Sequence, residues 1–158
     1  MVIYLDSGKL EDMETFGPTV SGFTTNPTLI KGVSDYKTYA KNILKTVSGK
    51  PVSFEVFADT MEGMEIQARE ICDWGPNVYV KIPVTNTLGQ STAFLCRRLS
   101  EAGIKLNVTA ICAMEQIRTV CHSLYPGTPS IVSIFAGRIA DTGRDPTPFI
   151  TAALHAKT

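Results

Sequence analysis

The sequence predicts an α/β fold built around a parallel β-sheet, and two observations support this. Short runs rich in β-branched and aromatic residues alternate along the chain with longer segments that have helical periodicity. The later runs also start at intervals of about 26 residues, which is the length of one compact strand–helix unit with short loops. Repeated strand–helix–strand units favour parallel pairing with right-handed crossovers.

Six segments of the chain are expected to form strands. Each is short, apolar and rich in β-branched residues, and polar or turn-forming residues flank it. In chain order the segments are 2–5 (VIYL), 20–24 (VSGFT), 52–57 (VSFEVF), 78–82 (VYVKI), 105–110 (KLNVTA) and 130–135 (SIVSIF).

Three of the intervening and following segments carry clear helix signals. In 59–74 and 113–124, apolar residues recur every three or four positions and form a single stripe. Asp59, with Glu62 three residues later, resembles a capping box at the start of the first of these helices. The third segment, 143–154, has proline near its start, as helices often do.

Composition predicts an ordinary globular protein and argues against several partners. The 158 residues carry 15 Lys and Arg against 15 Asp and Glu, so no net charge favours nucleic acid or an anionic membrane. No apolar stretch approaches the roughly 18 residues of a membrane span, and the N-terminal segment lacks the basic start of a signal peptide. The four cysteines show no metal-ligand spacing and are expected to be reduced thiols of a cytoplasmic protein. We predict no cofactor and no metal, and one domain over residues 1–158.

Nearly every predicted strand ends on a reactive or hydrogen-bonding residue. These residues are, in chain order, Asp6; Thr24, Thr25 and Asn26; Glu55; Lys81; Asn107 and Thr109; and Ser133, with Arg138 just beyond the sixth strand. In an open doubly wound sheet such ends would be spread along a row, whereas in a (β/α)8 barrel they converge on one mouth, where the active sites of that fold lie. The first strand is also followed by DSGKLED, not by a glycine-rich dinucleotide-binding turn. We therefore expect a barrel, of which this chain would supply about six of the eight units.

The segment VYVKIPV places Lys81 within an apolar strand, where it shares a face with Tyr79 because side chains alternate. Burial favours the neutral amine of a lysine, which can attack a carbonyl and form a Schiff base. The iminium then accepts electrons, so a neighbouring carbon–carbon bond can break or form without a metal. A solvated edge lysine is the simpler alternative, and an interior ion pair with Glu55 is compatible with catalysis.

The other strand ends carry the groups that Schiff-base chemistry needs. The site requires an acid/base for the substrate hydroxyl, a pair that orders the water, hydrogen bonds to substrate hydroxyls, and a cation for any phosphate. The candidates are, in that order, Asp6; Glu55 with Thr109; Asn26 with Asn107; and Arg138. Simpler roles are a helix N-cap for Asp6, turn residues for 24–26, and a surface cation for Arg138.

The segments that carry these residues resemble the transaldolase family, in the right order and over nearly the whole chain. They are YLDSGKLEDM, TTNPTLI, VYVKIPV, LNVTAI and SIFAGRIAD, and they are most similar to the small single-domain branch that includes fructose-6-phosphate aldolase. The resemblance implies a (β/α)8 barrel that transfers a dihydroxyacetone unit between sugar phosphates. It implies that Lys81 forms the Schiff base, that Asp6 is the acid/base for carbon–carbon cleavage, and that Glu55 and Thr109 handle the catalytic water. Substrate contacts are implied for Thr25, Asn26, Asn107, Ser133, Phe135 and Arg138, of which the last three lie on the phosphate side.

Position 55 discriminates within the family, because transaldolases carry glutamate there and fructose-6-phosphate aldolases carry glutamine. Glu55 therefore favours a transaldolase, with an aldolase that releases dihydroxyacetone as the alternative. The family fold has two further strands after the sixth unit, so we expect the chain to lack the C-terminal part of the barrel. A non-catalytic fragment is the third hypothesis. The full-length protein is expected to be a homo-oligomer.

Overall fold

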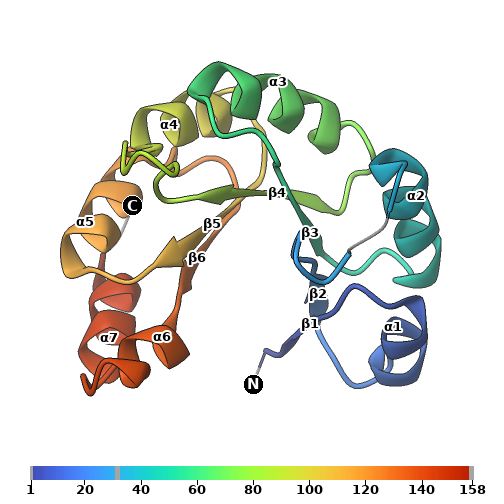
Figure 1. The fold of residues 1–158 in the computed structure, drawn as a ribbon, viewed down its shortest axis with the longest axis horizontal. Helices are drawn as coiled ribbons and strands as arrows, with labels where there is room; N and C mark the ends of the chain where they lie inside the picture. Colours follow the sequence, from blue (N-terminus) through green and yellow to red (C-terminus); the bar gives the residue numbers. More distant parts are fainter. Residues whose placement is uncertain (1, 31–32, 157–158) are drawn as a thin grey trace.

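Within residues 2–30 and 33–156, which the computed structural model describes, six parallel strands form one curled sheet (Figure 1). Each strand pairs with its neighbours in sequence, as in a (β/α) barrel, and the helices cover the convex side of the arch. The strands are Tyr4–Asp6 (β1), Gly22–Thr24 (β2), Val52–Glu55 (β3), Val78–Pro83 (β4), Leu106–Ile111 (β5) and Ser130–Ile134 (β6). The predicted α/β fold is confirmed, as a partial barrel of six strands with alternating helices.

The helices follow the strands in the predicted alternation. They are Leu10–Phe16 (α1), Tyr36–Thr46 (α2), Met61–Cys72 (α3), Ala93–Glu101 (α4), Met114–Ser123 (α5), Ala136–Asp141 (α6) and Thr147–His155 (α7). The apolar stripes predicted for α3 and α5 are confirmed, because Met64, Ala68 and Ile117 are completely buried. In the described part of the chain, no helix combines the length and apolarity that crossing a bilayer requires.

The predicted capping box at the start of α3 is wrong. The N-cap is Thr60, whose hydroxyl accepts a hydrogen bond from the Gly63 N–H at 3.1 Å. The Asp59 carboxylate instead accepts bonds from the N–H of Thr87, at 2.8 Å, and from its hydroxyl. Asp59 thus joins the loop after β3 to the loop after β4, a long-range contact that local spacing does not reveal.

The main core lies between the sheet and its outer helices. Alternate strand residues such as Val52, Phe54 and Val80 are fully buried there, and the Phe54 ring packs edge-on against Trp74 at 5.6 Å. Because side chains alternate, Ser53 and the other intervening strand residues face the inside of the arch. The polar residues of the strands are therefore collected on the concave face.

The strand register brings three of the candidate residues level with one another. Glu55 pairs with Lys81 between β3 and β4, and Lys81 pairs with Asn107 between β4 and β5. At the first pair of strands, Asp6 is opposite Thr24. Parallel pairing in sequence order thus sets Glu55, Lys81 and Asn107 in one row, while Thr24 is level with Ser53, two residues before Glu55.

Candidate active site

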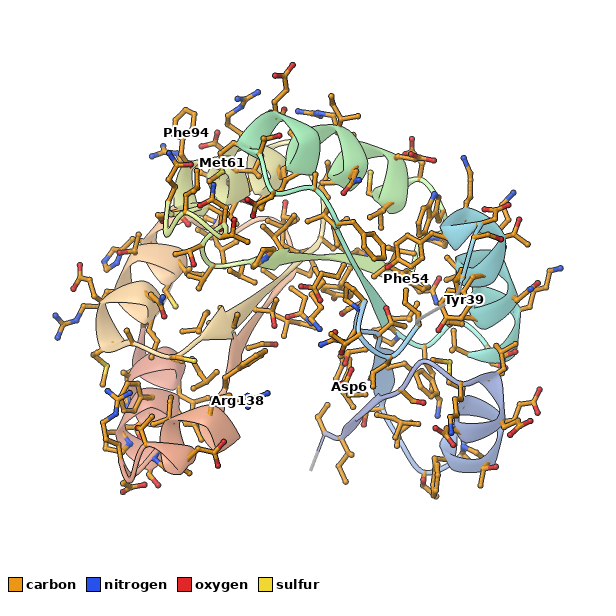
Figure 2. The ribbon with its side chains drawn as sticks, in the orientation of Figure 1. Asp6, Tyr39, Phe54, Met61, Phe94 and Arg138 are labelled. Carbon is orange, nitrogen blue, oxygen red and sulfur yellow. The ribbon has the colours of Figure 1, made fainter. Side chains whose placement is uncertain are left out.

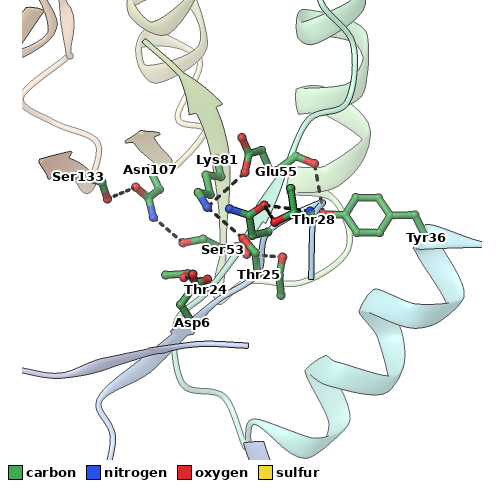
Figure 3. A network of polar contacts seen from close by, with 11 residues as sticks. Asp6, Thr24, Thr25, Thr28, Tyr36, Ser53, Glu55, Lys81, Asn107 and Ser133 are labelled. Atoms are coloured by element: carbon green, nitrogen blue, oxygen red, sulfur yellow. Dashed lines mark hydrogen bonds and ion pairs between the residues drawn. The ribbon is translucent and has the colours of Figure 1, made fainter. Parts of the chain in front are cut away.

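Lys81 lies near the centre of the row on the concave face, with only 5% of the residue exposed (Figure 3). Its ammonium nitrogen is 3.2 Å from Glu55 Oε2, and it donates a hydrogen bond to the main-chain carbonyl of Thr25 at 3.1 Å. This geometry contradicts the alternative that Lys81 is a solvated lysine on an edge strand, and it contains the interior ion pair between Lys81 and Glu55. The amine nitrogen is held between two acceptors at a fixed place on the inner face of β4.

Glu55 has a pKa above the ordinary value for a glutamate. Burial of the carboxyl is the main cause and the negative charge of Asp6 adds to it, whereas the positive charge and hydrogen bond of Lys81 act in the opposite direction. A carboxyl group whose pKa is raised above its ordinary value exchanges protons with water more readily near pH 7 than an exposed glutamate does.

A chain of hydrogen bonds extends from Lys81 across the neighbouring strands (Figure 3). Asn107 is 1% exposed; its amide donates to Ser53 Oγ at 3.0 Å, and its Oδ1 accepts from the Ser133 hydroxyl at 2.7 Å. The Thr25 hydroxyl donates to the main-chain carbonyl of Ser53 at 3.0 Å. These bonds fix the Asn107 side-chain amide and join four strands.

Ser53 connects this network but was not among the residues predicted from sequence. It is completely buried, and it receives bonds from both Asn107 and Thr25. Ser53 lies two residues before Glu55 on the same strand, so the two share a face. The alternation of side chains along the strand, with a period of two residues, could therefore have identified Ser53.

Thr109 has a side-chain hydroxyl that is buried and has no hydrogen-bond partner within the described residues. An unpaired buried hydroxyl is costly and is satisfied when a water or a substrate group binds to it. The next residue, Ala110, has a left-handed backbone with φ of 61°, and the β5–β6 register shifts between Val108 and Ile111. Strained conformations of this kind occur preferentially at functional sites.

Asp6 lies at the end of β1 and is exposed, and its Oδ1 accepts a hydrogen bond from the Thr24 hydroxyl at 2.6 Å. It is not the N-cap of α1, since that position is occupied by Lys9. Its carboxylate is close enough to raise the pKa of Glu55. Asp6 therefore provides a second, more solvated carboxylate beside the buried ion pair.

The remaining predicted residues do not join the central network. Asn26 Oδ1 accepts bonds from the N–H and hydroxyl of Thr28 at 3.0 and 2.8 Å, which is a turn arrangement. Phe135 is half-buried at the start of α6. Arg138 is exposed on α6, on the opposite flank of the arch from Asp6 (Figure 2). Phe135 and Arg138 both line an open pocket of about 450 Å³.

Among the described residues, no group of three or more His, Cys, Asp or Glu side chains lies close enough together to hold a metal ion. The four cysteines are free thiols, and Cys96 and Cys121 are buried.

Comparison with known proteins gives a match over nearly the whole chain. A family model described as transaldolase/fructose-6-phosphate aldolase matches residues 3–157. The chain is also similar to three curated proteins named "Probable transaldolase". It is 37% identical to that of Dehalococcoides mccartyi over 150 residues, 39% identical to that of Methanococcus maripaludis over 148 residues, and 35% identical to that of Streptococcus agalactiae over 158 residues.

These alignments cover most of the chain but a smaller share of each relative. They include 92% of the chain for the first two relatives and 98% for the third. The chain spans 65% of the length of the first two relatives and 69% of the third.

Proposed function

Because the chain belongs to the transaldolase/fructose-6-phosphate aldolase family, we propose that it is a transaldolase that acts through a Schiff base on Lys81. It would transfer a dihydroxyacetone unit between sugar phosphates, for example from sedoheptulose 7-phosphate to glyceraldehyde 3-phosphate. The observation that carries this proposal is the buried Lys81 amine, held 3.2 Å from the Glu55 carboxylate. We further propose that the enzyme is cytoplasmic, that it works as a homo-oligomer, and that it belongs to the pentose phosphate pathway.

The first step is attack of the Lys81 amine on the ketone carbon of the donor sugar. The amine must be neutral to attack, and Glu55 is positioned to accept its proton because the two groups are already in contact. Loss of water from the resulting carbinolamine gives the iminium. We assign this water to Glu55 and Thr109, because Thr109 has a buried hydroxyl with no partner in the described part of the chain.

The second step breaks the carbon–carbon bond. Asp6 removes the proton from the hydroxyl on the fourth carbon, the bond between the third and fourth carbons breaks, and its electron pair moves into the iminium to give an enamine. The aldose phosphate leaves. The enamine then attacks the aldehyde of the acceptor, Asp6 returns the proton, and water hydrolyses the new iminium to release the product and the Lys81 amine.

The other candidate residues would bind the substrate. The side-chain amides of Asn26 and Asn107 can bond to sugar hydroxyls, and Asn107 is held in one orientation by its two serine partners. Arg138 is assigned to the phosphate group, since it is exposed beside an open pocket and a guanidinium binds phosphate through paired hydrogen bonds. Ser133 and Phe135 complete the phosphate side, and Thr25 supplies the carbonyl that orients Lys81.

Borohydride trapping tests the Schiff base directly. Incubation with fructose 6-phosphate and borohydride should reduce the iminium and leave a stable adduct on the peptide that contains Lys81. Lys50 is a matched internal control, because its ammonium, like that of Lys81, donates to the main chain, here to the carbonyls of Gly17 and Val20. Unlike Lys81, it has no carboxylate partner within the described residues. A chain that gives no mass shift on the Lys81 peptide would contradict the proposal.

A second assay separates the transferase from the lyase. With fructose 6-phosphate and no acceptor aldehyde, a transaldolase should release almost no free dihydroxyacetone, whereas a fructose-6-phosphate aldolase releases it continuously. Glu55 favours transfer, and we expect Glu55→Gln to increase the ratio of release to transfer. Continuous release by the unmodified chain would assign the lyase activity instead. Absence of both activities, together with an aggregating product, would support the non-catalytic fragment.

A further inference from the structure

Two tyrosines in the first turn of α2, Tyr36 and Tyr39, contact the main chain beside both carboxylates of the site. They lie three residues apart on one helix, and their rings are stacked with centroids 6.3 Å apart and planes inclined by 17°. The helix that carries both, α2, covers the convex side of the sheet, and the substrate would bind on the concave side (Figure 1). Both phenols donate a hydrogen bond to a main-chain carbonyl.

Tyr36 is connected to the strand that carries Glu55. Its hydroxyl donates to the main-chain carbonyl of Glu55 itself, at 3.2 Å (Figure 3). The ring is held edge-on by Phe57 at 4.7 Å and by Trp74 at 5.1 Å. These aromatic contacts leave the phenol little freedom, so the hydrogen bond fixes the end of β3 from behind.

Tyr39 is connected to the loop that carries Asp6. Its hydroxyl donates to the main-chain carbonyl of Gly8 at 2.8 Å, two residues after Asp6. At Gly8 the loop lies so close to the next one that a Cβ would be 2.5 Å from the carbonyl oxygen of Leu29. The same loop is held from the other side by the Ser7 hydroxyl, which donates to Asp12 at 2.6 Å.

Both phenols remain hydrogen-bond donors throughout the neutral pH range. Burial raises the pKa of Tyr39 to about 12, and burial also raises the pKa of Tyr36 well above its ordinary value. Neither group ionises under conditions in which the enzyme would work, so these two contacts do not change with pH.

We propose that Tyr36 and Tyr39 are positioning residues that set the distance between Glu55 and Asp6. Because the two rings belong to one turn of helix and are stacked on each other, they hold the end of β3 and the β1–α1 loop in a fixed relation. The inference rests on the proposed function, in which the two carboxylates serve different steps. Tyr36 supports the water-handling step of imine formation through Glu55, and Tyr39 supports carbon–carbon cleavage through Asp6.

The test uses Tyr36→Phe and Tyr39→Phe, which each remove one hydroxyl and keep the ring. Imine formation is measured alone by the rate of borohydride trapping with dihydroxyacetone, which has three carbons and therefore lacks the bond between the third and fourth carbons that the enzyme would cleave. Cleavage is measured by the transfer of dihydroxyacetone from fructose 6-phosphate to erythrose 4-phosphate. We expect Tyr36→Phe to lower both rates by about tenfold, and Tyr39→Phe to lower transfer by about tenfold while trapping stays within about twofold of the unmodified chain.

The control is Tyr125→Phe, because Tyr125 is exposed and its hydroxyl makes no hydrogen bond in the described part of the chain. Rates are compared below the lowest thermal transition of the variants, so that differences in the folded fraction do not contribute. If Tyr39→Phe fails to fold, Asp12→Ala loosens the same loop through Ser7 and should give the same split between the two rates.

The outcomes separate the inference from the proposed function. No Lys81 adduct in the unmodified chain contradicts the proposed function itself. A normal adduct, with both rates lowered equally in the Tyr39→Phe variant, indicates a general structural role and overturns the inference. Unchanged rates in both tyrosine variants overturn it as well. The expected split is specific to positioning, since a loss of stability alone would lower the two rates together.

Discussion

Replacement of Lys81 by methionine should reveal how much the buried ion pair contributes to folding. At 3.2 Å, and with an effective dielectric constant of about 20, the attraction between Lys81 and Glu55 is about 5 kcal/mol before desolvation is subtracted. Removing one partner of a buried pair costs about 3–5 kcal/mol, because the other charge is left uncompensated. Since 16% of the Glu55 side chain is exposed, we expect Lys81→Met to lower the free energy of unfolding by about 3 kcal/mol at pH 7.

The double variant Lys81→Met/Glu55→Gln is the matched comparison, because it removes the uncompensated carboxylate and should recover about 2 kcal/mol of that loss. The pKa of Glu55 is raised in the folded protein, and loss of the Lys81 charge raises it further. A raised carboxyl pKa destabilises the fold above that pKa and ceases to do so as the pH falls through it. The deficit of the Lys81→Met variant should therefore shrink between pH 7 and pH 5.

Urea denaturation followed by circular dichroism at both pH values measures these differences. If the single and double variants are equally unstable, or if the Lys81→Met deficit does not depend on pH, the reasoning about an uncompensated buried carboxylate is wrong. The comparison does not require activity, so it tests the geometry of the site independently of the proposed reaction.

Three further outcomes are expected. As the pH is lowered, the trapping rate of the unmodified chain should start to fall at a pH above the ordinary glutamate pKa of about 4.5, because burial raises the pKa of Glu55. The pH–rate profile of the Glu55→Gln variant should lack this decrease at acid pH. Thr109→Val should raise the free energy of unfolding by up to about 1 kcal/mol, because it removes an unpaired buried hydroxyl, while the trapping rate falls about tenfold or more. A loss of stability in urea would argue against the unpaired hydroxyl. Gly8→Ala should lower the free energy of unfolding in urea by about 2 kcal/mol, because the added Cβ would meet the Leu29 carbonyl at 2.5 Å. An unchanged midpoint would show that the two loops are not in close contact.

Periodicity predicted the strands, and the polar residues at the strand ends predicted the barrel and the central residues of the site. Lys81 was expected on a face away from Val80 and Ile82, and in the structure it faces the inside of the arch while those two residues are fully buried. The polar strand ends were expected to converge, and in the structure Asn107 pairs with Lys81 between β4 and β5. Patterns with a period of two residues are read reliably because each strand buries one face against the helices.

Contacts between distant segments were not predictable in this way. The capping box at Asp59 was wrong because its carboxylate binds Thr87, 28 residues further along the chain. The left-handed backbone at Ala110 coincides with the shift in β5–β6 register between Val108 and Ile111, and alanine itself gives no signal for it. Nothing in the local sequence indicates that the phenol of Tyr36 reaches the main-chain carbonyl of Glu55, 19 residues further along the chain.

The hydrogen bonds of the site run across the strands and join segments that are far apart in sequence, which determines when the site forms during folding. Lys81 is joined to Thr25 across 56 residues of chain, Asn107 to Ser53 across 54, and Ser133 to Asn107 across 26. Contacts between residues so far apart in sequence form late, because each closes a long loop. A chain still emerging from the ribosome therefore has its early helices before its amine is enclosed. The contacts of Lys81 with Thr25 and Glu55 need only the segments up to β4. The Asn107 amide is fixed only when β5 and β6 have docked, so the network is completed together with the sheet.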